Sequence, residues 1–358
     1  MRRWVKRITK IFVILFLLGS ALASAILFGT SYGHQLRVIA AESILTSQHR
    51  QWAKYTLLSE KELKDILENI TNPKWVDSGK AVNLTLSQRE LKRREPLAIT
   101  ITTISRTYSD HYFEGKLMTV SNPLNVKLVM QQGAQGAESG EQIDVMAKRN
   151  HALAAVNASG FDDETGHGSG KTPIGTVIAN GQVMNAEEGR DTPSLISGLT
   201  ADGDMITGNY SPNQLLQQGV VSAAGFIPQL IVKGEKMITK GNGGWGYGPR
   251  TIMAQKKDGT MIFLVIDGRQ KHSIGASLKD CQDILYDMGA YNAMAMDGGS
   301  SASIYAMDQL LNIPSTLSHQ ARHLPNCWVV TARSGQKVEI TIDGQPASSR
   351  EISNIIGS

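Results

Sequence analysis

The pattern of apolar and polar positions divides the chain into an uncharged run, a helical region and a longer region of strands and turns. The run from Ile11 to Gly29 contains no charged residue and is long enough to cross a bilayer as a helix. The stretch from Gln35 to Ile70 is polar and has a helical pattern. Within it, Ser59-Glu60-Lys61-Glu62 has the form of a capping box before Leu63, Ile66, Leu67 and Ile70, whose spacing marks one apolar face. These patterns predict a transmembrane helix followed by a helical stalk.

Strand patterns begin near Leu97, where the β-branched segment 97–104 predicts the first strand of a larger domain. Further on, the spacing predicts a strand over 124–130, a short helix over 143–151 and a buried strand over 153–156 that ends at Asn157. The pairs typical of hairpin turns are Asn180-Gly181, Asp202-Gly203 and Asp258-Gly259. Hairpins together with helices predict an α+β fold with a mixed β-sheet.

The segment from Met261 to Met296 predicts the unit on which this domain is built. The apolar runs 261–266 and 293–296 have the composition of strands buried on both faces. Between them, an amphipathic stripe that begins at Ser277 and stops at Gly289 predicts a helix. A strand, a helix and a strand of this length form a right-handed crossover between parallel strands. The turns after the two strands are therefore expected at one edge of the sheet, where such sheets usually bind ligands.

These two turns, Asp267-Gly268-Arg269 and Asp297-Gly298-Gly299-Ser300-Ser301, carry suitable chemistry for a site. Each offers a carboxylate, glycines that allow a ligand to approach the backbone, and either a guanidinium or hydroxyl groups. Asp-Gly is also a common turn dipeptide. Two such turns at one predicted edge favour a binding or catalytic site.

Several segments resemble, in the same order, the signature of the phosphodiester glycosidase domain family, which includes uncovering-enzyme-like proteins and bacterial surface proteins of the exopolysaccharide-biosynthesis type. The segments that carry the resemblance are HALAAVNASGFDDETG, TPIGTVIANGQVM, GPRTIMAQKKDGTMIFLVIDGR, AMAMDGGSSAS and RHLPNCWVV. They lie between Leu124 and Val330. Two positions depart from the family pattern: segment 157–161 lacks the paired glycines and the second aromatic residue, and Ser300 stands where a third glycine is usual.

The resemblance implies a hydrolase that cleaves the bond between the anomeric carbon of a sugar and a phosphodiester. It implies catalytic residues Asp267, Asp297, Arg250 and Arg269, and substrate-binding residues Asn157, Phe161, Thr251, Gly298, Gly299, Ser300, Ser301 and Arg322. Arginine suits this substrate because its planar fork donates two parallel hydrogen bonds to phosphate oxygens. Glycosyl transfer typically uses two carboxylates, and which of them is the acid, base or nucleophile stays open.

Several of these residues also have a purely structural interpretation. Asn157 can close its strand as an Asx-turn, Phe161 can be a core residue, and Arg250 can pair with a carboxylate. A serine hydrolase centred on Ser301 is disfavoured, because GGSSAS is not a nucleophile elbow. The alternative functions are a non-catalytic module that binds polysaccharide or assists exopolysaccharide assembly, and a glycosyl or phosphoryl transferase.

The most glycine-rich loop of the chain, Lys240 to Thr251, contains Trp245 and Tyr247. Glycines with embedded aromatic residues predict a lid that closes over a carbohydrate, with Arg250 at its end. A separate acidic loop, 161–171, carries four residues that could hold a hard cation such as calcium or magnesium: Asp162, Asp163, Glu164 and His167. A solvated loop is the favoured interpretation, so no cofactor is expected.

Composition and charge change the interpretation mainly at the N-terminus. With 41% hydrophobic and 19% charged residues, the chain has an ordinary globular composition. Its net charge of +4 is accounted for by five basic residues before Ile11, so the remainder is close to neutral, which argues against a broad nucleic-acid-binding face. Basic residues before an apolar run predict a cytoplasmic N-terminus and an exported domain. A signal peptide cleaved near Ala23-Ser24-Ala25 is the competing interpretation.

The expected organisation is a cytoplasmic basic segment (1–10), a transmembrane signal anchor (11–29), a juxtamembrane helical stalk and linker (30–96), the glycosidase-like domain (97–334) and a C-terminal tail with a hairpin (335–358). The expected partners are a glycan or phosphosugar polymer as substrate and the membrane, which the protein would enter through its N-terminal helix; the oligomeric state stays open. Cys281 and Cys327 are expected as buried free thiols rather than as an extracytoplasmic disulfide, because Cys281 lies on the predicted apolar helix face.

Overall fold

The computed structural model describes residues 2–47, 49–79, 85–132, 139–162 and 169–357. The helices are α1 (Arg2–Gly29), α2 (Ser31–Leu45), η1 (Arg50–Thr56, a 3-10 helix), α3 (Glu60–Thr71), α4 (Leu86–Arg94), η2 (Pro123–Asn125), α5 (Ile143–Arg149), α6 (Pro212–Gln217), α7 (Leu278–Asp287), η3 (Gly299–Ser301) and α8 (Ser349–Gly357). Internal contacts divide the chain into two compact units, Met1–Thr71 with Gly244–Gly246, and Asn72–Gly243 with Tyr247–Ser358.

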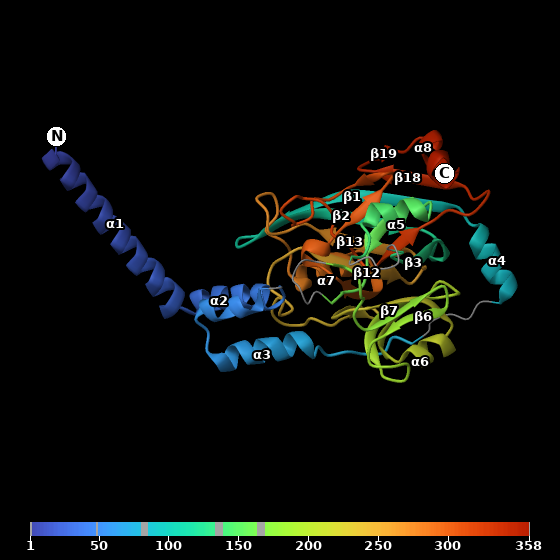
Figure 1. Cartoon of the computed structure of the whole chain (residues 1–358), viewed down its shortest axis with the longest axis horizontal. Coiled ribbons are helices and arrows are strands. Elements are labelled where there is room, and N and C mark those ends of the chain that lie inside the picture. The colour runs from blue at the N-terminus through green and yellow to red at the C-terminus, as the bar shows by residue number, and fades with distance from the viewer. Residues whose placement is uncertain (1, 48, 80–84, 133–138, 163–168, 358) are drawn as a thin grey trace. The chain divides into compact units, whose positions relative to one another are not determined.

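The strands all lie in the second unit (Figure 1). They are β1 (Leu97–Thr107), β2 (Tyr112–Val120), β3 (Val126–Met130), β4 (Ala154–Asn157), β5 (Thr176–Ala179), β6 (Gln182–Ala186), β7 (Ser194–Thr200), β8 (Met205–Tyr210), β9 (Val220–Gly225), β10 (Gln229–Val232), β11 (Glu235–Lys236), β12 (Arg250–Lys256), β13 (Met261–Ile266), β14 (Ala290–Met296), β15 (Ile304–Ala306), β16 (Gln309–Leu310), β17 (Asn326–Val330), β18 (Val338–Ile342) and β19 (Gln345–Pro346). Helices and strands together confirm the predicted α+β class.

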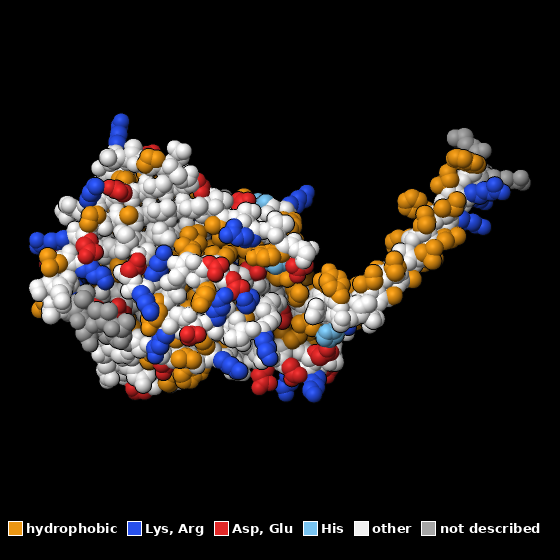
Figure 2. Space-filling view, turned by 180° about the vertical axis from the view of Figure 1, so that it is seen from behind, with side chains coloured by type: hydrophobic (Ala, Val, Ile, Leu, Met, Phe, Trp, Pro, Cys, Tyr) orange, Lys and Arg blue, Asp and Glu red, His pale blue; other side chains and the backbone are white. Residues whose placement is uncertain are grey.

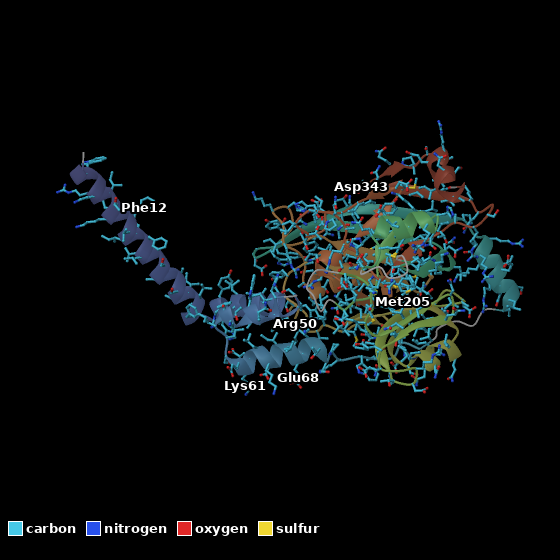
Figure 3. The ribbon with its side chains drawn as sticks, viewed as in Figure 1. Phe12, Arg50, Lys61, Glu68, Met205 and Asp343 are labelled. Atoms are coloured by element: carbon cyan, nitrogen blue, oxygen red, sulfur yellow. The ribbon has the colours of Figure 1, made fainter. Side chains whose placement is uncertain are left out.

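The first unit contains the apolar helix α1. Its segment Lys6–Gly29 is 24 residues long and, by length and composition, could cross a membrane or serve as a signal sequence. Figure 2 shows apolar side chains along the length of α1, with basic side chains near its N-terminal end; Phe12, labelled in Figure 3, is one of these apolar residues. The capping box predicted before α3 is confirmed, since the Ser59 amide donates to Glu62 Oε2 (2.8 Å) and the Glu62 amide donates to Ser59 Oγ (3.2 Å).

The small core of the first unit includes a residue from the distant glycine-rich loop. Leu45, Ala53 and Ile70 are buried there, and Trp245 packs against them. The next residue, Gly246, donates its amide to Glu42 Oε2 (3.1 Å), and a Cβ on it would lie 2.0 Å from the Ser43 hydroxyl. Glycine is therefore required for this close approach.

The second unit contains a nine-stranded mixed sheet with the order β11-β10-β14-β12-β13-β2-β1-β18-β19. The β1–β18 pair is parallel and the other pairs are antiparallel. The predicted crossover is confirmed, because β13, α7 and β14 follow one another and both strands run antiparallel to β12. The difference from the prediction is that β12 is inserted between them. The carboxyl ends of β13 and β14 therefore flank the first residues of β12, where Arg250 lies opposite Ile266 and Thr251 opposite Met296.

Within the described residues, this unit also contains two five-stranded sheets, with the orders β16-β15-β4-β17-β3 and β6-β5-β9-β7-β8. The largest core cluster draws side chains from all three sheets, among them Phe263, Trp328 and Val177. The three predicted hairpins are confirmed as β5–β6, β7–β8 and β12–β13. In the first of them, Asn180 and Gly181 both have positive φ angles (50° and 73°), as a tight hairpin turn requires.

Two segments outside the expected domain have more structure than the sequence analysis predicted. The expected linker contains α4, which begins with a capping box formed by Thr85 and Gln88. The C-terminal tail forms the expected hairpin between β18 and β19, but β18 also extends the large sheet and α8 follows. Asp343 in the hairpin turn, labelled in Figure 3, accepts hydrogen bonds from the Thr103 hydroxyl (2.8 Å) and Lys116 Nζ (3.1 Å). Cys281 and Cys327 are buried free thiols, as expected.

Candidate active site

The two predicted turns meet at the segment that leads into β12. A Cβ on Gly268 would lie 2.6 Å from the Pro249 nitrogen, and a Cβ on Gly298 would lie 2.8 Å from the Pro249 oxygen. The Gly299 amide also donates to the Pro249 oxygen (3.0 Å). The turn after β13 and the turn after β14 thus pack on the same proline, and glycine is needed in each because the backbones approach so closely. Three strand ends meet at one edge of the sheet.

Two guanidinium groups converge at this edge. A Cβ on Gly248 would lie 3.8 Å from Arg269 Nη2 and 4.0 Å from Arg250 Nη2, so both arginines reach the same point. Arg250 is buried and its Nε donates to the Ala276 oxygen (3.0 Å). Arg269 is solvent-exposed and also lies against Gly299, with Nη1 3.4 Å from the position of a Cβ there. This pair provides a positively charged surface that suits a phosphate group.

The surrounding protein lowers the pKa of Arg269 by desolvation. Since arginine titrates far above neutral pH and this residue still contacts solvent, its guanidinium remains charged. Its backbone has a positive φ of 59° and its amide donates to the Ile274 oxygen (2.9 Å), which holds the turn closed. A tight turn therefore fixes the backbone from which this charged side chain extends.

The two candidate carboxylates have different environments. Asp267 is 4% exposed, and its carboxylate accepts hydrogen bonds from Asn312 Nδ2 (2.9 Å), the Ile313 amide (3.2 Å) and the imidazole of His272 (3.1 Å). Asp297 is only partly buried. The structure thus gives Asp267 a role in holding the turn together, while Asp297 is more accessible to a ligand. A direct catalytic role for either residue stays a prediction.

Asn157 fixes the backbone around Asp297. It is fully buried, and its Nδ2 donates to the main-chain carbonyl oxygen of Asp297 (2.6 Å). Its Oδ1 accepts hydrogen bonds from the Thr251 hydroxyl (2.8 Å) and the Ser303 amide (3.0 Å). Thr251 is also fully buried. Both residues therefore position neighbouring elements, and their direct contact with a substrate stays a prediction.

Arg322 brings Phe161 and Ser300, a residue of the turn after β14, together. The Arg322 guanidinium lies 4.8 Å from the centre of the Phe161 ring, and its Nη1 donates to the Ser300 hydroxyl (2.9 Å). Phe161 packs in a core cluster as well, so the core interpretation and the site interpretation both describe it. Ser301 is 1% exposed, with its amide bonded to the Gly298 oxygen (3.1 Å), so its hydroxyl belongs to the interior.

The predicted lid differs from the structure. Trp245 packs in the core of the first unit, and Tyr247 stacks on His111 with ring centres 4.0 Å apart. Of the acidic loop, residues 163–168 lie outside the described part of the chain, which includes the predicted ligands Asp163, Glu164 and His167. Within the described residues there is no group of three or more His, Cys, Asp or Glu side chains arranged to hold a metal ion.

The sequence analysis missed three polar residues that hold the site. Asn312 and His272 bind the Asp267 carboxylate, and Asn326 accepts hydrogen bonds from the Ser159 amide and hydroxyl (both 3.0 Å). Asn326 lies in the segment RHLPNCWVV, so the family resemblance offered a signal for it. His272 lies five residues after Asp267 in the same turn, whereas nothing in the local sequence connects Asn312 to the site.

Comparison with known proteins agrees with the family resemblance found in the sequence. A family model described as "Phosphodiester glycosidase" matches residues 150–331, about half of the chain. The SPbeta prophage-derived uncharacterized protein YomE of Bacillus subtilis (strain 168) is 27% identical over 185 residues, which is 49% of this chain and 28% of that protein. The N-acetylglucosamine-1-phosphodiester alpha-N-acetylglucosaminidase of Bos taurus is 23% identical over 236 residues, which is 60% of this chain and 43% of the enzyme. The matches thus span less than half the length of these two relatives.

A solved structure shares the fold. The catalytic domain of zebrafish N-acetylglucosamine-1-phosphodiester alpha-N-acetylglucosaminidase, auto-inhibited by its pro-peptide, superposes with a TM-score of 0.56 at 22% sequence identity. The superposition covers 73% of this chain and 88% of the zebrafish chain.

Proposed function

The chain belongs to the phosphodiester glycosidase family, and on that basis we propose that it is an enzyme that hydrolyses a glycosyl phosphodiester bond. Its substrate would be a sugar-1-phosphodiester linkage in a surface glycan or cell-wall polymer. Water would add to the anomeric carbon, the bond from that carbon to the phosphate oxygen would break, and the products would be a free sugar and a phosphomonoester.

The observation that carries this proposal is the convergence of Arg250 and Arg269 beside the turn after β14. A phosphodiester carries one negative charge, and its oxygens gain a second charge as the phosphomonoester leaves. Two fixed guanidinium groups stabilise that developing charge more than they stabilise the substrate, which is the condition for catalysis. The partly buried Asp297 lies at the start of the same turn.

The leaving group explains why one accessible carboxylate is sufficient. The second pKa of a phosphomonoester is about 6, so the departing oxygen is stable as an anion and does not require a strong general acid. We therefore assign Asp297 the reaction at the anomeric carbon, as base or nucleophile. Asp267, which is buried and hydrogen-bonded, would hold the turn that carries Arg269.

The location proposed for the enzyme is the outer face of a membrane. Helix α1 would anchor the chain, with its basic N-terminal residues in the cytoplasm and the second unit exported. This location would place the site near glycans of the cell surface. Protease protection of the second unit in sealed vesicles of known orientation tests it, and digestion from the cytoplasmic side would contradict it.

The function is tested with the full chain in detergent and a small panel of sugar-1-phosphodiesters. Free sugar and phosphomonoester are measured together, with Asp297→Asn as the variant because it keeps the shape of the side chain. Equal release of both products by the native protein, and its loss in the variant, would support hydrolysis at this site. Tight binding of a surface polymer without any release from its own linkage would instead support a non-catalytic polysaccharide-binding module.

A further inference from the structure

A buried histidine outside the candidate site connects two segments that hold Arg250. His111 lies between β1 and β2 and is 7% exposed. Its Nδ1 is 2.9 Å from Asp110 Oδ1, and its Nε2 is 3.0 Å from Asp280 Oδ2. The imidazole is also stacked between the rings of Tyr108 and Tyr247, with ring centres at 4.6 Å and 4.0 Å and planes inclined by 12° in both pairs.

One of these carboxylates, Asp110, binds a residue of the segment that precedes Arg250. The Tyr247 hydroxyl donates to Asp110 Oδ2 (2.6 Å), so Tyr247 is held by a hydrogen bond at its tip and by ring stacking along its face. Tyr247 is three residues before Arg250 and is followed directly by Gly248, the residue on which the two guanidinium groups converge. His111 therefore fixes the start of the segment that enters β12.

The other carboxylate, Asp280, belongs to the helix cap that follows Ala276, and the carbonyl oxygen of Ala276 binds the Arg250 side chain. Asp280 forms the capping box of α7 with Ser277, whose amide and hydroxyl donate to Asp280 Oδ2 (2.8 Å and 2.6 Å). The residue before this cap is Ala276, whose oxygen accepts from Arg250 Nε (3.0 Å) and whose amide donates to the Gly248 oxygen (3.1 Å). Displacement of the α7 cap would thus move the acceptor of the Arg250 side chain.

We propose that His111 is a positioning residue for Arg250, and that its protonated form joins the glycine-rich loop to the N-terminus of α7. Each ring nitrogen faces an oxygen of a carboxylate, and an ionised carboxylate only accepts hydrogen bonds. The imidazolium ion satisfies both contacts because it donates from both nitrogens. A neutral imidazole leaves one nitrogen lone pair facing a carboxylate, which weakens one of the two connections.

The consequence is a dependence of phosphate binding on pH. The titratable groups that face His111 are Asp110 and Tyr108 from its own turn, Tyr247 from the glycine-rich loop and Asp280 from α7. The hydrogen bonds from Tyr247 and His111 lower the pKa of Asp110, so this carboxylate is ionised in the range where histidine titrates. Positioning is therefore complete while both ring nitrogens of His111 carry protons, and it weakens when one of these protons is lost.

The test compares full-length native protein with His111→Gln, which cannot become a cation. This inference rests on the proposed function, so kcat/KM for a sugar-1-phosphodiester is measured from about pH 5.5 to 9, the range that includes histidine titration. The native profile is expected to fall towards high pH. The variant is expected to be about 10-fold to 100-fold less active at low pH, with a flatter profile, because small displacements of a catalytic group have effects of that size.

The matched control is His34→Gln, which removes another histidine that contacts a carboxylate, Glu62 Oε1 at 2.8 Å, in the first unit. It is expected to retain the native pH profile. Tyr247→Phe provides a second variant in case His111→Gln fails to fold, because it keeps the stacked ring and removes only the hydrogen bond to Asp110. Equal profiles for native protein, His111→Gln and Tyr247→Phe would overturn the proposal.

Hydrogen–deuterium exchange separates this inference from the proposed function. In native protein, exchange of the amides of residues 248, 250–252 and 276–281, corrected for the intrinsic pH dependence of exchange, is expected to increase as the pH rises, whereas in His111→Gln it is expected to be fast throughout. This result can be obtained without any turnover, so an inactive native protein that shows it would refute only the proposed hydrolysis. Exchange that is the same in both proteins at every pH would refute the role of His111.

Discussion

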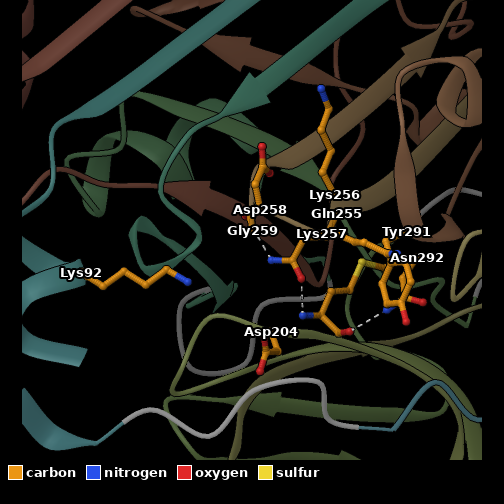
Figure 4. A pocket seen from close by; sticks show the side chains of 10 residues that line it. Lys92, Asp204, Gln255, Lys256, Lys257, Asp258, Gly259, Tyr291 and Asn292 are labelled. Carbon is orange, nitrogen blue, oxygen red and sulfur yellow. Dashed lines mark hydrogen bonds between the residues drawn. The ribbon is translucent and has the colours of Figure 1, made fainter. Parts of the chain in front are cut away.

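The two ends of strands β12, β13 and β14 carry polar side chains of different kinds. At one end, Arg250 and Asp267 are buried; Arg250 donates a hydrogen bond to the Ala276 oxygen, and Asp267 accepts one from Asn312. At the other end there is an open pocket of about 290 Å³, shown in Figure 4. Its charged residues are Lys92, Asp204, Lys256, Lys257 and Asp258.

Hydrogen bonds hold the base of this pocket in place, whereas its charged lysine side chains are flexible. Gln255 accepts from the Met205 amide (2.7 Å) and donates to the Gly259 oxygen (3.2 Å), as the dashed lines in Figure 4 show. The lysines stand on long flexible stems, and Lys257 Nζ lies 5.1 Å from the centre of the Tyr291 ring. Charge alone therefore does not distinguish the proposed catalytic edge from this pocket. The difference is that the proposed edge has groups fixed before a substrate arrives, which need no reorganisation during a reaction.

The largest expected effect is the loss of the accessible carboxylate. Asp297→Ala should lower kcat by about a thousandfold or more, since it removes the group assigned to the anomeric carbon. The Asp297 backbone would still be held by Asn157, so the variant should fold. Product release is the measurement, and a change in KM alone would show that the residue only binds substrate.

Replacement of one guanidinium should have the next largest effect. Arg250→Lys is expected to lower kcat/KM by about 100-fold to 1,000-fold, because an ammonium group cannot reproduce a fixed two-pronged contact with phosphate. The variant keeps the positive charge, so a decrease of this size would show that geometry matters. Near-native activity would contradict the assignment of Arg250 as a phosphate ligand.

A positioning residue should affect stability as well as activity. Asn157→Ala would leave the Thr251 hydroxyl and the Ser303 amide without their acceptor in a fully buried place. The expected loss in the free energy of unfolding is about 2–3 kcal/mol, measured by chemical denaturation. An unchanged free energy of unfolding with reduced substrate affinity would instead indicate that Asn157 binds the substrate directly.

The smallest effect is expected at the lysine end of the strands. The double variant Lys256→Ala with Lys257→Ala should change kcat/KM less than about twofold and the free energy of unfolding by less than about 0.5 kcal/mol, as for ordinary surface positions. Turnover is measured with both small and polymeric substrates. A large loss of turnover with the polymeric substrate alone would show that the pocket contacts the chain of a long substrate.

Local patterns predicted the elements of this protein better than their arrangement. The helix signals at Ser277 and Gly289 gave α7, and the Asn180-Gly181 pair gave a hairpin, because caps and turns depend on neighbouring residues. The insertion of β12 between β13 and β14 could not be predicted, since strand order depends on contacts between distant segments. The same is true of Asn312, which reaches Asp267 from a different loop.

The candidate site shows the same division. The two Asp-Gly turns were predicted to share an edge, and they do. Their individual roles could not be predicted, because an aspartate after a buried strand gives the same sequence signal whether it is buried, as Asp267 is, or accessible, as Asp297 is. The amide of Asn157 was likewise compatible with a turn or with a ligand until its bonding partners were known.

The path of the glycine-rich loop has a consequence for how the protein can be divided. A fragment that begins at residue 72 would keep every strand of the described residues but would lose the helices against whose core Trp245 packs. The Trp245 indole would then be exposed to water five residues before Arg250. The fragment would tend to aggregate, or its glycine-rich loop would adopt another conformation. Removal of residues 1–29 alone leaves α2, η1 and α3 in place. The point at which the chain is cut thus decides whether a soluble version reports the native site.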